Sequence, residues 1–194
     1  MGRQNVEAIY PLSPMQQGML FHSLVTPETG VYVEQTTCTL RGPLDVPAFE
    51  RAWQRVVDRH DILRTAFVWK RVEKLLQAVH RQVTIRLDQY DWRGLSEEDQ
   101  DKEMRSLLRK DREQGFDLAR PPLMRLALVR VSEDAYRFLW SHHHILLDGW
   151  SLPLLLREVL SLYGAFRQGR DLALPPARHY RDYINWLKQQ DTSG

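Results

Sequence analysis

Three consecutive histidines, His142 to His144, stand shortly before an Asp148-Gly149 pair, and these are the residues of the chain best suited to chemistry. An imidazole with its ordinary pKa of about 6.5 accepts or donates a proton near neutral pH. A carboxylate can pair with a cation or order a loop, and a glycine lets the backbone approach a substrate closely. Because functional groups often lie on loops held by a rigid scaffold, this segment is the candidate site.

A strand predicted over residues 135–142 gives the histidines different positions. Its period of two places His142 and His144 on one face and His143 on the other, so adjacent histidines cannot share one role. We expect His144 at the reacting centre, either as a general base or as a group that positions an amine by hydrogen bonding. For His143 we expect a structural role.

The residues after the histidines predict a turn followed by a helix. Ser151 suits a helix N-cap, with Pro153 in the first turn. Asp148 and Gly149 then lie in the turn, where the Gly149 N–H can stabilise negative charge that develops on a substrate oxygen. Trp150 either walls a channel or covers the core, and Ser151 is a further candidate for lining a channel.

Two other chemistries are disfavoured by the pattern. The four-residue spacing of His144 and Asp148 suits a metal only on a helix, and no further ligand stands at a recognisable spacing, so no metal site is expected. The chain has no GxSxG motif, and Cys38 lies in a predicted strand without a histidine close in sequence. A covalent nucleophile is therefore not expected.

The rest of the chain reads as one α/β unit without repeats or an internal linker. Strands are predicted over residues 31–40, 63–69, 75–80, 83–87 and 123–131, and helices from Ser13, Asp45, Ser96, Ser151 and Tyr180. The strands at 123–131 and 135–142 are expected to form a hairpin.

Composition excludes several classes of partner. Lys+Arg 27 against Asp+Glu 25 leaves a net charge of +2 without a dense basic stripe, so nucleic acid is not expected to bind. No apolar run approaches the roughly twenty residues of a membrane span, and the first residues lack an apolar signal core. The single cysteine, Cys38, suits a reducing compartment. We expect a cytoplasmic protein.

Four stretches, in the family's order, resemble motifs of the condensation domains of nonribosomal peptide synthetases. His143 to Gly149 matches HHxxxDG, and residues 59–67, RHDILRTAF, resemble RHExLRTxF with Asp61 in place of glutamate. Residues 10–16, YPLSPMQ, resemble the opening motif, and residues 180–186, YRDYINW, resemble YxDYxxW. HHxxxDG alone is shared with other acyltransferases, whereas the four together are much more specific.

This resemblance implies a chloramphenicol acetyltransferase-like fold, an α/β (α+β) two-layer sandwich with a mixed sheet packed against helices. Condensation domains have two similar lobes with the active site in the channel between them. By this resemblance we expect residues 1–194 to correspond to the N-terminal lobe, with the C-terminal lobe absent from this chain. Amide-forming acyl transfer is therefore expected of the full domain, and the isolated lobe is expected to be inactive.

The implied reaction joins a carrier-bound acyl or peptidyl thioester donor to a carrier-bound aminoacyl acceptor through an amide bond. Both substrates are attached to the 4'-phosphopantetheine of partner carrier proteins, so no cofactor is expected on this chain. The implied partners are upstream donor and downstream acceptor peptidyl carrier proteins, the missing lobe and an adenylation domain. Gly18 and the leucine-rich residues 145–150 resemble the subtype that accepts a donor ending in a D-residue.

The resemblance also implies a partner for the motif aspartate. Arg64, the second arginine of the RHExLRTxF-like stretch, is implied to pair with Asp148 and so to fix the turn that carries Gly149. We therefore expect Asp148→Asn or Arg64→Ala to harm folding as much as rate.

Three other functions stay open. One is an HxxxDG acyltransferase that uses coenzyme A, against which the opening and RHDILRT motifs count. A second is a condensation-like module that only binds carriers or a tailoring enzyme, against which the intact histidine motif counts. A third is condensation-like epimerisation, which shares the histidine motif and would keep its distinguishing acid in the absent lobe.

Overall fold

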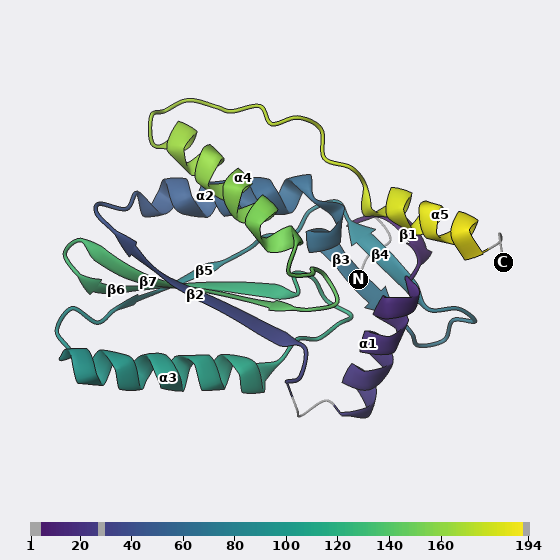
Figure 1. Ribbon diagram of the computed structural model, residues 1–194, viewed down its shortest axis with the longest axis horizontal. Coiled ribbons are helices and arrows are strands. Elements are labelled where there is room, and N and C mark those ends of the chain that lie inside the picture. Colours follow the sequence, from purple (N-terminus) through teal and green to yellow (C-terminus); the bar gives the residue numbers. More distant parts are fainter. Residues whose placement is uncertain (1–4, 27–29, 192–194) are drawn as a thin grey trace.

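The computed structural model describes residues 5–26 and 30–191 (Figure 1). The first four residues, part of the stretch expected to lack an apolar signal core, lie outside the described residues. The strands are β1 (Val6–Pro11), β2 (Val33–Arg41), β3 (Thr65–Val68), β4 (Leu76–His80), β5 (Leu87–Asp91), β6 (Met124–Ser132) and β7 (Ala135–His143). The helices are α1 (Pro14–Val25), α2 (Val46–Arg59), the short 3₁₀ helix η3 (Asp61–Arg64), α3 (Glu97–Gln114), α4 (Ser151–Phe166) and α5 (Tyr180–Asp191).

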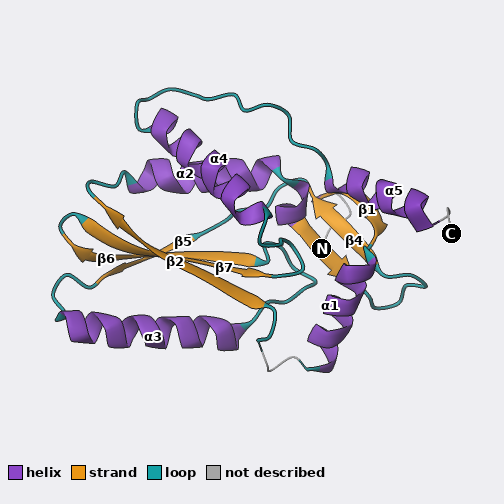
Figure 2. Cartoon of the chain, viewed as in Figure 1, coloured by secondary structure: helices purple, strands orange, loops and turns teal. Residues whose placement is uncertain are grey.

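The strands form two sheets, which Figure 2 shows in orange. The larger has the order β2-β7-β6-β5: β7 pairs antiparallel with β2 and β6, and β5 runs parallel to β6. The smaller is antiparallel with the order β1-β4-β3. The predicted hairpin is β6 and β7, and its second strand carries the histidines to the end of the larger sheet.

Helix α2 forms where the sequence predicts it, and its cap shows why. The Asp45 side chain accepts a hydrogen bond from the Ala48 N–H at 3.0 Å, and Pro47 lies in the first turn. An N-cap of this kind contributes about 1 kcal/mol to helix stability. The apolar face of α2 is buried with α4 against one face of the larger sheet (Figure 1).

An aromatic cluster fills the space between these helices and the sheet. Trp53 of α2 and Trp140 of β7 are both fully buried, with ring centroids 4.9 Å apart. Phe49 and Phe138 meet edge to face at 5.2 Å. Such aromatic pairs add about 0.5 to 1.5 kcal/mol beyond the burial of their surface. The core therefore packs against the face of β7 that carries Phe138 and Trp140, and His142 lies on the same face.

Helix α3 covers the opposite face of the larger sheet (Figure 1), and one of its carboxylates contacts three strands. Asp111 accepts hydrogen bonds from Arg125 of β6 at 2.7 Å, from Ser141 of β7 at 2.5 Å and from Gln35 of β2 at 2.7 Å. Three donors on three strands fix a single helix position, because a buried carboxylate needs its lone pairs satisfied.

Two predicted strands differ from the structure. The strand predicted over residues 83–87 is wrong, because Gln54 of α2 takes the backbone groups there: its side chain donates to the Val83 carbonyl and accepts from the Ile85 N–H. The neighbouring strand instead begins at Leu87. Arg64, predicted inside a strand, ends the 3₁₀ helix η3. Strand β1 was not predicted, although it pairs with β4 along its length.

Candidate active site

The histidine motif bridges β7 and α4, as the sequence predicts. Strand β7 ends at His143 and α4 begins at Ser151. The loop between them is held by three consecutive apolar side chains buried in the main core, those of Ile145, Leu146 and Leu147. A loop anchored this way keeps a fixed shape, because moving it would expose these three large apolar side chains to water.

His142 belongs to the core. Its ring lies against Trp140, with centroids 5.0 Å apart and an interplanar angle of 35°. Its buried Nδ1 has no hydrogen-bond partner among the described residues. Burial, followed by the neighbouring His144, lowers the pKa of His142 to about 4, so its ring is neutral at pH 7.

His143 points to the opposite face and has a defined tautomer. Its Nδ1 accepts a hydrogen bond from the Ile145 N–H at 3.1 Å, which places the ring proton on Nε2. The Nε2–H then donates to the Ser23 hydroxyl at 3.2 Å, and that hydroxyl donates to the Met19 carbonyl at 2.8 Å. Burial also lowers the pKa of His143 to about 4. This geometry suits the structural role expected of His143.

His144 follows the last residue of the strand and is half-buried. Its backbone N–H donates to the Tyr32 carbonyl at 2.8 Å, just before β2 begins. Its ring has no hydrogen-bond partner among residues 5–26 and 30–191. Of the three histidines, His144 thus combines a fixed backbone with a half-buried ring that makes no hydrogen bond to the described residues.

Asp148 orders the turn through Ser151. Its Oδ1 accepts from the Ser151 N–H at 2.9 Å and from the Ser151 hydroxyl at 2.6 Å. The Ser151 hydrogen bond is the main cause that lowers the pKa of Asp148, so the carboxylate is ionised at neutral pH. Ser151 was predicted as the N-cap, but it is the first helical residue, and Asp148 supplies the capping oxygen instead. Trp150 is 86% exposed and does not cover the core of this chain.

Gly149 adopts a backbone conformation open to other residues. A Cβ at this position would meet no atom within 4 Å, and its φ is not in the left-handed region. Its N–H forms no hydrogen bond with another described residue. The use of this N–H toward a substrate oxygen therefore stays a prediction.

The implied pair between Arg64 and Asp148 is wrong. The buried Arg64 guanidinium instead binds Glu7 at 2.9 Å and Asp61 at 3.0 Å, and it also donates to the carbonyls of His80 and Arg81. Asp61 lies one helical turn before Arg64 in η3. Glu7 of β1 and His80 of β4, two paired strands of the smaller sheet, supply the other acceptors, so the Arg64 guanidinium points toward that sheet.

The Arg64 cluster also reaches the C-terminal part of the chain. His179, just before α5, meets the second oxygen of Asp61 at 2.7 Å, which raises the pKa of His179. Glu7, Arg64, Asp61 and His179 therefore join β1, η3 and the start of α5. Arg64 therefore holds β1, β4 and η3 together and does not contact the turn of the motif.

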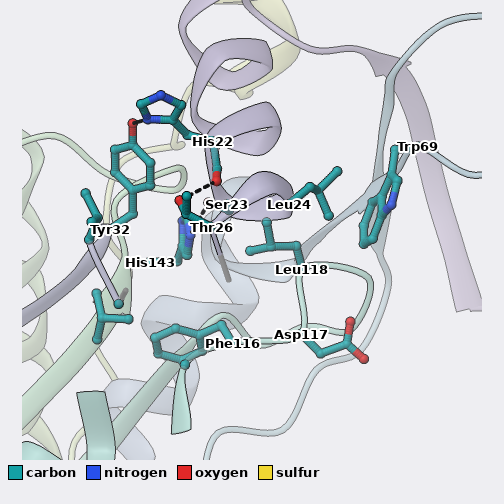
Figure 3. Close-up of a pocket in the computed structure, with 14 residues that line it drawn as sticks. His22, Ser23, Leu24, Thr26, Tyr32, Trp69, Phe116, Asp117, Leu118 and His143 are labelled. Carbon is teal, nitrogen blue, oxygen red and sulfur yellow. Dashed lines mark hydrogen bonds between the residues drawn. The ribbon is translucent and has the colours of Figure 1, made fainter. Parts of the chain in front are cut away.

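A cavity of about 200 Å³ lies beside the motif, on the His143 side (Figure 3). It is bounded by the C-terminal half of α1, the start of β2, Trp69 and residues 115–118. Figure 3 shows His143, Tyr32 and Phe116 along one wall, with Trp69 opposite. His143 lines this cavity and His144 does not.

Sequence reasoning missed the residues that support the histidines. Ser23 and Tyr32 bind the motif from α1 and from the segment before β2, and no motif marks either residue. Among the described residues, no group of three or more His, Cys, Asp or Glu side chains is arranged to hold a metal ion. None of the described helices is long and apolar enough to span a membrane.

The buried His142 predicts a loss of stability in acid. An unfolded histidine binds its proton near pH 6.5 and folded His142 only near pH 4, so the unfolded state binds more protons between these values. The contribution is fully present above pH 6.5 and is lost as the pH falls toward 4, by about 2 kcal/mol at pH 5. In urea unfolding at pH 7.5 and 5, His142→Phe should lose about 2 kcal/mol less stability than wild type.

A matched control for this experiment is Phe138→Leu. Phe138 is buried on the same face of β7 as His142 but carries no titratable group, so its replacement changes core packing without changing proton binding. The pH dependence of this variant should follow wild type. Equal pH dependence of wild type and His142→Phe would contradict the assignment of a neutral His142.

The chain belongs to the condensation domain family of nonribosomal peptide synthetases, because the model named "Condensation domain" matches residues 6–194. It resembles one of the linear gramicidin synthase subunits of Brevibacillus parabrevis, with 47% identity over 183 residues that cover 94% of this chain and 2% of the synthase. It also resembles bacitracin synthase 3 of Bacillus licheniformis, with 43% identity over 189 residues, 97% of this chain and 3% of the synthase. The chain thus spans a small part of these relatives.

Solved structures agree on the fold. The starter condensation domain of rhizomide synthetase superposes with a TM-score of 0.85 at 23% identity, over 94% of this chain and 45% of that chain. A cyclization-docking bidomain from Sorangium cellulosum superposes with a TM-score of 0.77 at 26% identity, over 94% of this chain and 36% of that chain. The expected fold class, an α/β lobe with a mixed sheet packed against helices, is confirmed.

Proposed function

We propose that this chain is the N-terminal lobe of a condensation domain that forms an amide bond between two carrier-bound substrates. An acceptor amine attacks the carbonyl carbon of a donor thioester, the carbon–sulfur bond breaks, and the donor carrier leaves as a thiol. The observation that carries the proposal is His144, whose backbone is fixed while its ring has no partner among the described residues.

The main contribution that this reaction requires from the protein is to position the amine and the thioester. A thioester is already activated, and holding amine and carbonyl in attack geometry can supply about 7 to 11 kcal/mol of the barrier. His144 can hydrogen-bond the amine into place or accept its proton. A neutral His143 and an ionised Asp148 hold the strand end and the turn around it. The Gly149 N–H is the proposed donor to the thioester oxygen.

We infer that a second lobe completes the channel. Trp150, at 86% exposure, and Leu154, at 56%, project from the motif and the first turns of α4. Large apolar side chains this exposed beside a candidate site are typical of a surface that another unit covers. Coverage of 45% of a solved condensation domain supports the same inference. The isolated lobe should then be inactive, with Trp150 and Ser151 lining the channel of the full domain.

The proposed partners follow from the substrates. Donor and acceptor peptidyl carriers deliver them on 4'-phosphopantetheine arms, an adenylation domain loads the acceptor carrier, and the reaction takes place in the cytoplasm. The proposal of a D-configured donor rests, at Gly18, only on the resemblance of this residue to the family subtype that accepts such donors. A Cβ at Gly18 would meet no atom within 4 Å, so space does not require a glycine there.

The experiment that tests the function is intact-mass detection of a carrier-bound dipeptide. The full condensation domain containing this chain is mixed with loaded donor and acceptor carriers, with D- and L-configured donors in parallel. We expect dipeptide on the acceptor carrier and free thiol on the donor carrier. Omitting the acceptor amine should abolish the product.

Each alternative gives a different result in the same assay. Inversion of a carrier-bound residue without dipeptide would indicate epimerisation. Acyl transfer from a coenzyme A thioester without carriers would indicate a carrier-independent acyltransferase. Carrier binding without turnover by correctly folded protein would indicate a binding module. Any of these three outcomes would contradict the proposed function.

A further inference from the structure

Helix α1 contacts the motif loop through a buried pair of glutamine side chains. Gln16 of α1 and Gln77 of β4 are both almost fully buried. The Gln16 Oε1 accepts from the Gln77 amide at 2.9 Å and from the Ser13 N–H at 3.0 Å. The Gln77 amide also donates to the Pro11 carbonyl at 3.0 Å. This network locks the Gln16 side chain in one orientation.

The locked side chain of Gln16 holds the residue that follows His144. Its Nε2 lies 3.4 Å from the Ile145 carbonyl oxygen and donates to it. The oxygen is buried with the Ile145 side chain. A buried carbonyl without a donor is costly, so this hydrogen bond fixes the peptide plane of Ile145.

The N–H of Ile145 is held from the same helix. It donates to Nδ1 of His143, whose Nε2–H is bound by Ser23 at the other end of α1. The Ser23 hydroxyl is oriented by the Met19 carbonyl, one turn earlier in the helix. Both polar groups of Ile145 are thus tied to α1, one directly by Gln16 and one through His143.

We propose that α1 positions His144 for catalysis, with Gln16 and Ser23 as the positioning residues that hold the backbone of Ile145. The catalytic consequence rests on the proposed function, whereas the structural tie does not. His144 is bonded covalently to Ile145, and its own N–H is fixed by Tyr32. Loss of the Gln16 or the Ser23 hydrogen bond would let the His144 ring move. A displacement of about 1 Å at a reacting centre can lower the rate by up to 100-fold.

The test compares Gln16→Met with Gln17→Met. Both changes remove an amide of similar size from α1, but Gln17 is exposed and its amide donates only to the Leu12 carbonyl, away from the motif. In this chain, amide hydrogen exchange at Leu146, whose N–H shares a peptide group with the Ile145 carbonyl and donates to the His143 carbonyl, should become about tenfold faster in Gln16→Met, the factor that corresponds to one lost hydrogen bond. The His144 ring signals in nitrogen-15 NMR should shift. Gln17→Met should match wild type in both measurements.

The same variants are then placed in the full condensation domain. Gln16→Met should lower the single-turnover rate of amide formation about tenfold and change the KM for the acceptor carrier less than about twofold. A general loss of folding would lower the active fraction instead, which active-site titration detects. Ser23→Ala should give the same pattern with a smaller loss, because His143 keeps its bond to Ile145.

The outcomes separate the two claims. Wild-type exchange and wild-type rate in a folded Gln16→Met variant overturn the proposal. Faster exchange with an unchanged rate overturns the positioning role. If wild-type protein forms no amide, the proposed function fails, yet exchange and ring signals still test the tie. If Gln16→Met does not fold, Ser23→Ala decides, and wild-type values for it in both measurements overturn the proposal.

Discussion

Replacing His144 by alanine in the full condensation domain should lower the rate of amide formation by about 10²- to 10⁴-fold, the range for loss of a general acid–base group. The fold should persist, because the ring makes no hydrogen bond with the described residues and the backbone N–H keeps its bond to Tyr32. Single-turnover kinetics with loaded carriers measure the rate, and thermal melting checks the fold.

His60→Gln is the matched control for this experiment. His60 lies at the end of α2, where its ring meets Glu158 of α4, and it has no part in the proposed chemistry. It should keep the wild-type rate. A second variant, His144→Gln, separates the two roles left open: glutamine can accept a hydrogen bond from an amine but cannot take its proton. Full activity of His144→Ala would reduce the histidine to a bystander while amide formation itself could stand.

Replacing Arg64 by methionine should destabilise the chain by about 3 to 5 kcal/mol, the cost of removing one partner from a buried ion pair. For a chain of this size the melting temperature should fall by roughly 10 °C. The change leaves Asp61 without its guanidinium and frees the carbonyls of His80 and Arg81. It also removes the main cause that lowers the pKa of Glu7. Urea unfolding of this chain measures the difference.

Two other variants give this experiment its contrast. Arg93→Met removes an arginine whose ion pairs with Asp91 and Glu133 are exposed, and its unfolding midpoint should stay close to wild type. Asp148→Asn keeps an oxygen acceptor for Ser151 and should be much milder than Arg64→Met. Equal losses in Asp148→Asn and Arg64→Met would favour the pair that the family resemblance implied over the contacts described above.

The sequence is most informative where local chemistry decides the structure. The N-cap at Asp45 and the period-two pattern before the histidines are both local, and helix α2 and strand β7 form as predicted. The different roles of His142, His143 and His144 follow from the same alternation. The family motifs add the order of the elements and the identity of the candidate base, which patterning alone leaves open.

Long-range contacts explain what could not be predicted. The strand expected over residues 83–87 has suitable alternation, but a side chain of α2 competes for its backbone groups. Arg64 could reach several carboxylates in principle, and only the fold brings Glu7 beside it across 57 residues of sequence. Likewise, nothing local marks Ser23 as a partner of His143, because 120 residues separate the two.

The Arg64 cluster also bears on how condensation sequences of this kind can be recombined in chimeric synthetases. Glu7 and Asp61 contact the Arg64 guanidinium, and His179, far along the chain, contacts the second oxygen of Asp61. A crossover placed anywhere between these positions would join halves from two parents that must agree on this cluster. Exchange boundaries should therefore lie outside residues 7–179, or the donor sequence should carry all four residues together.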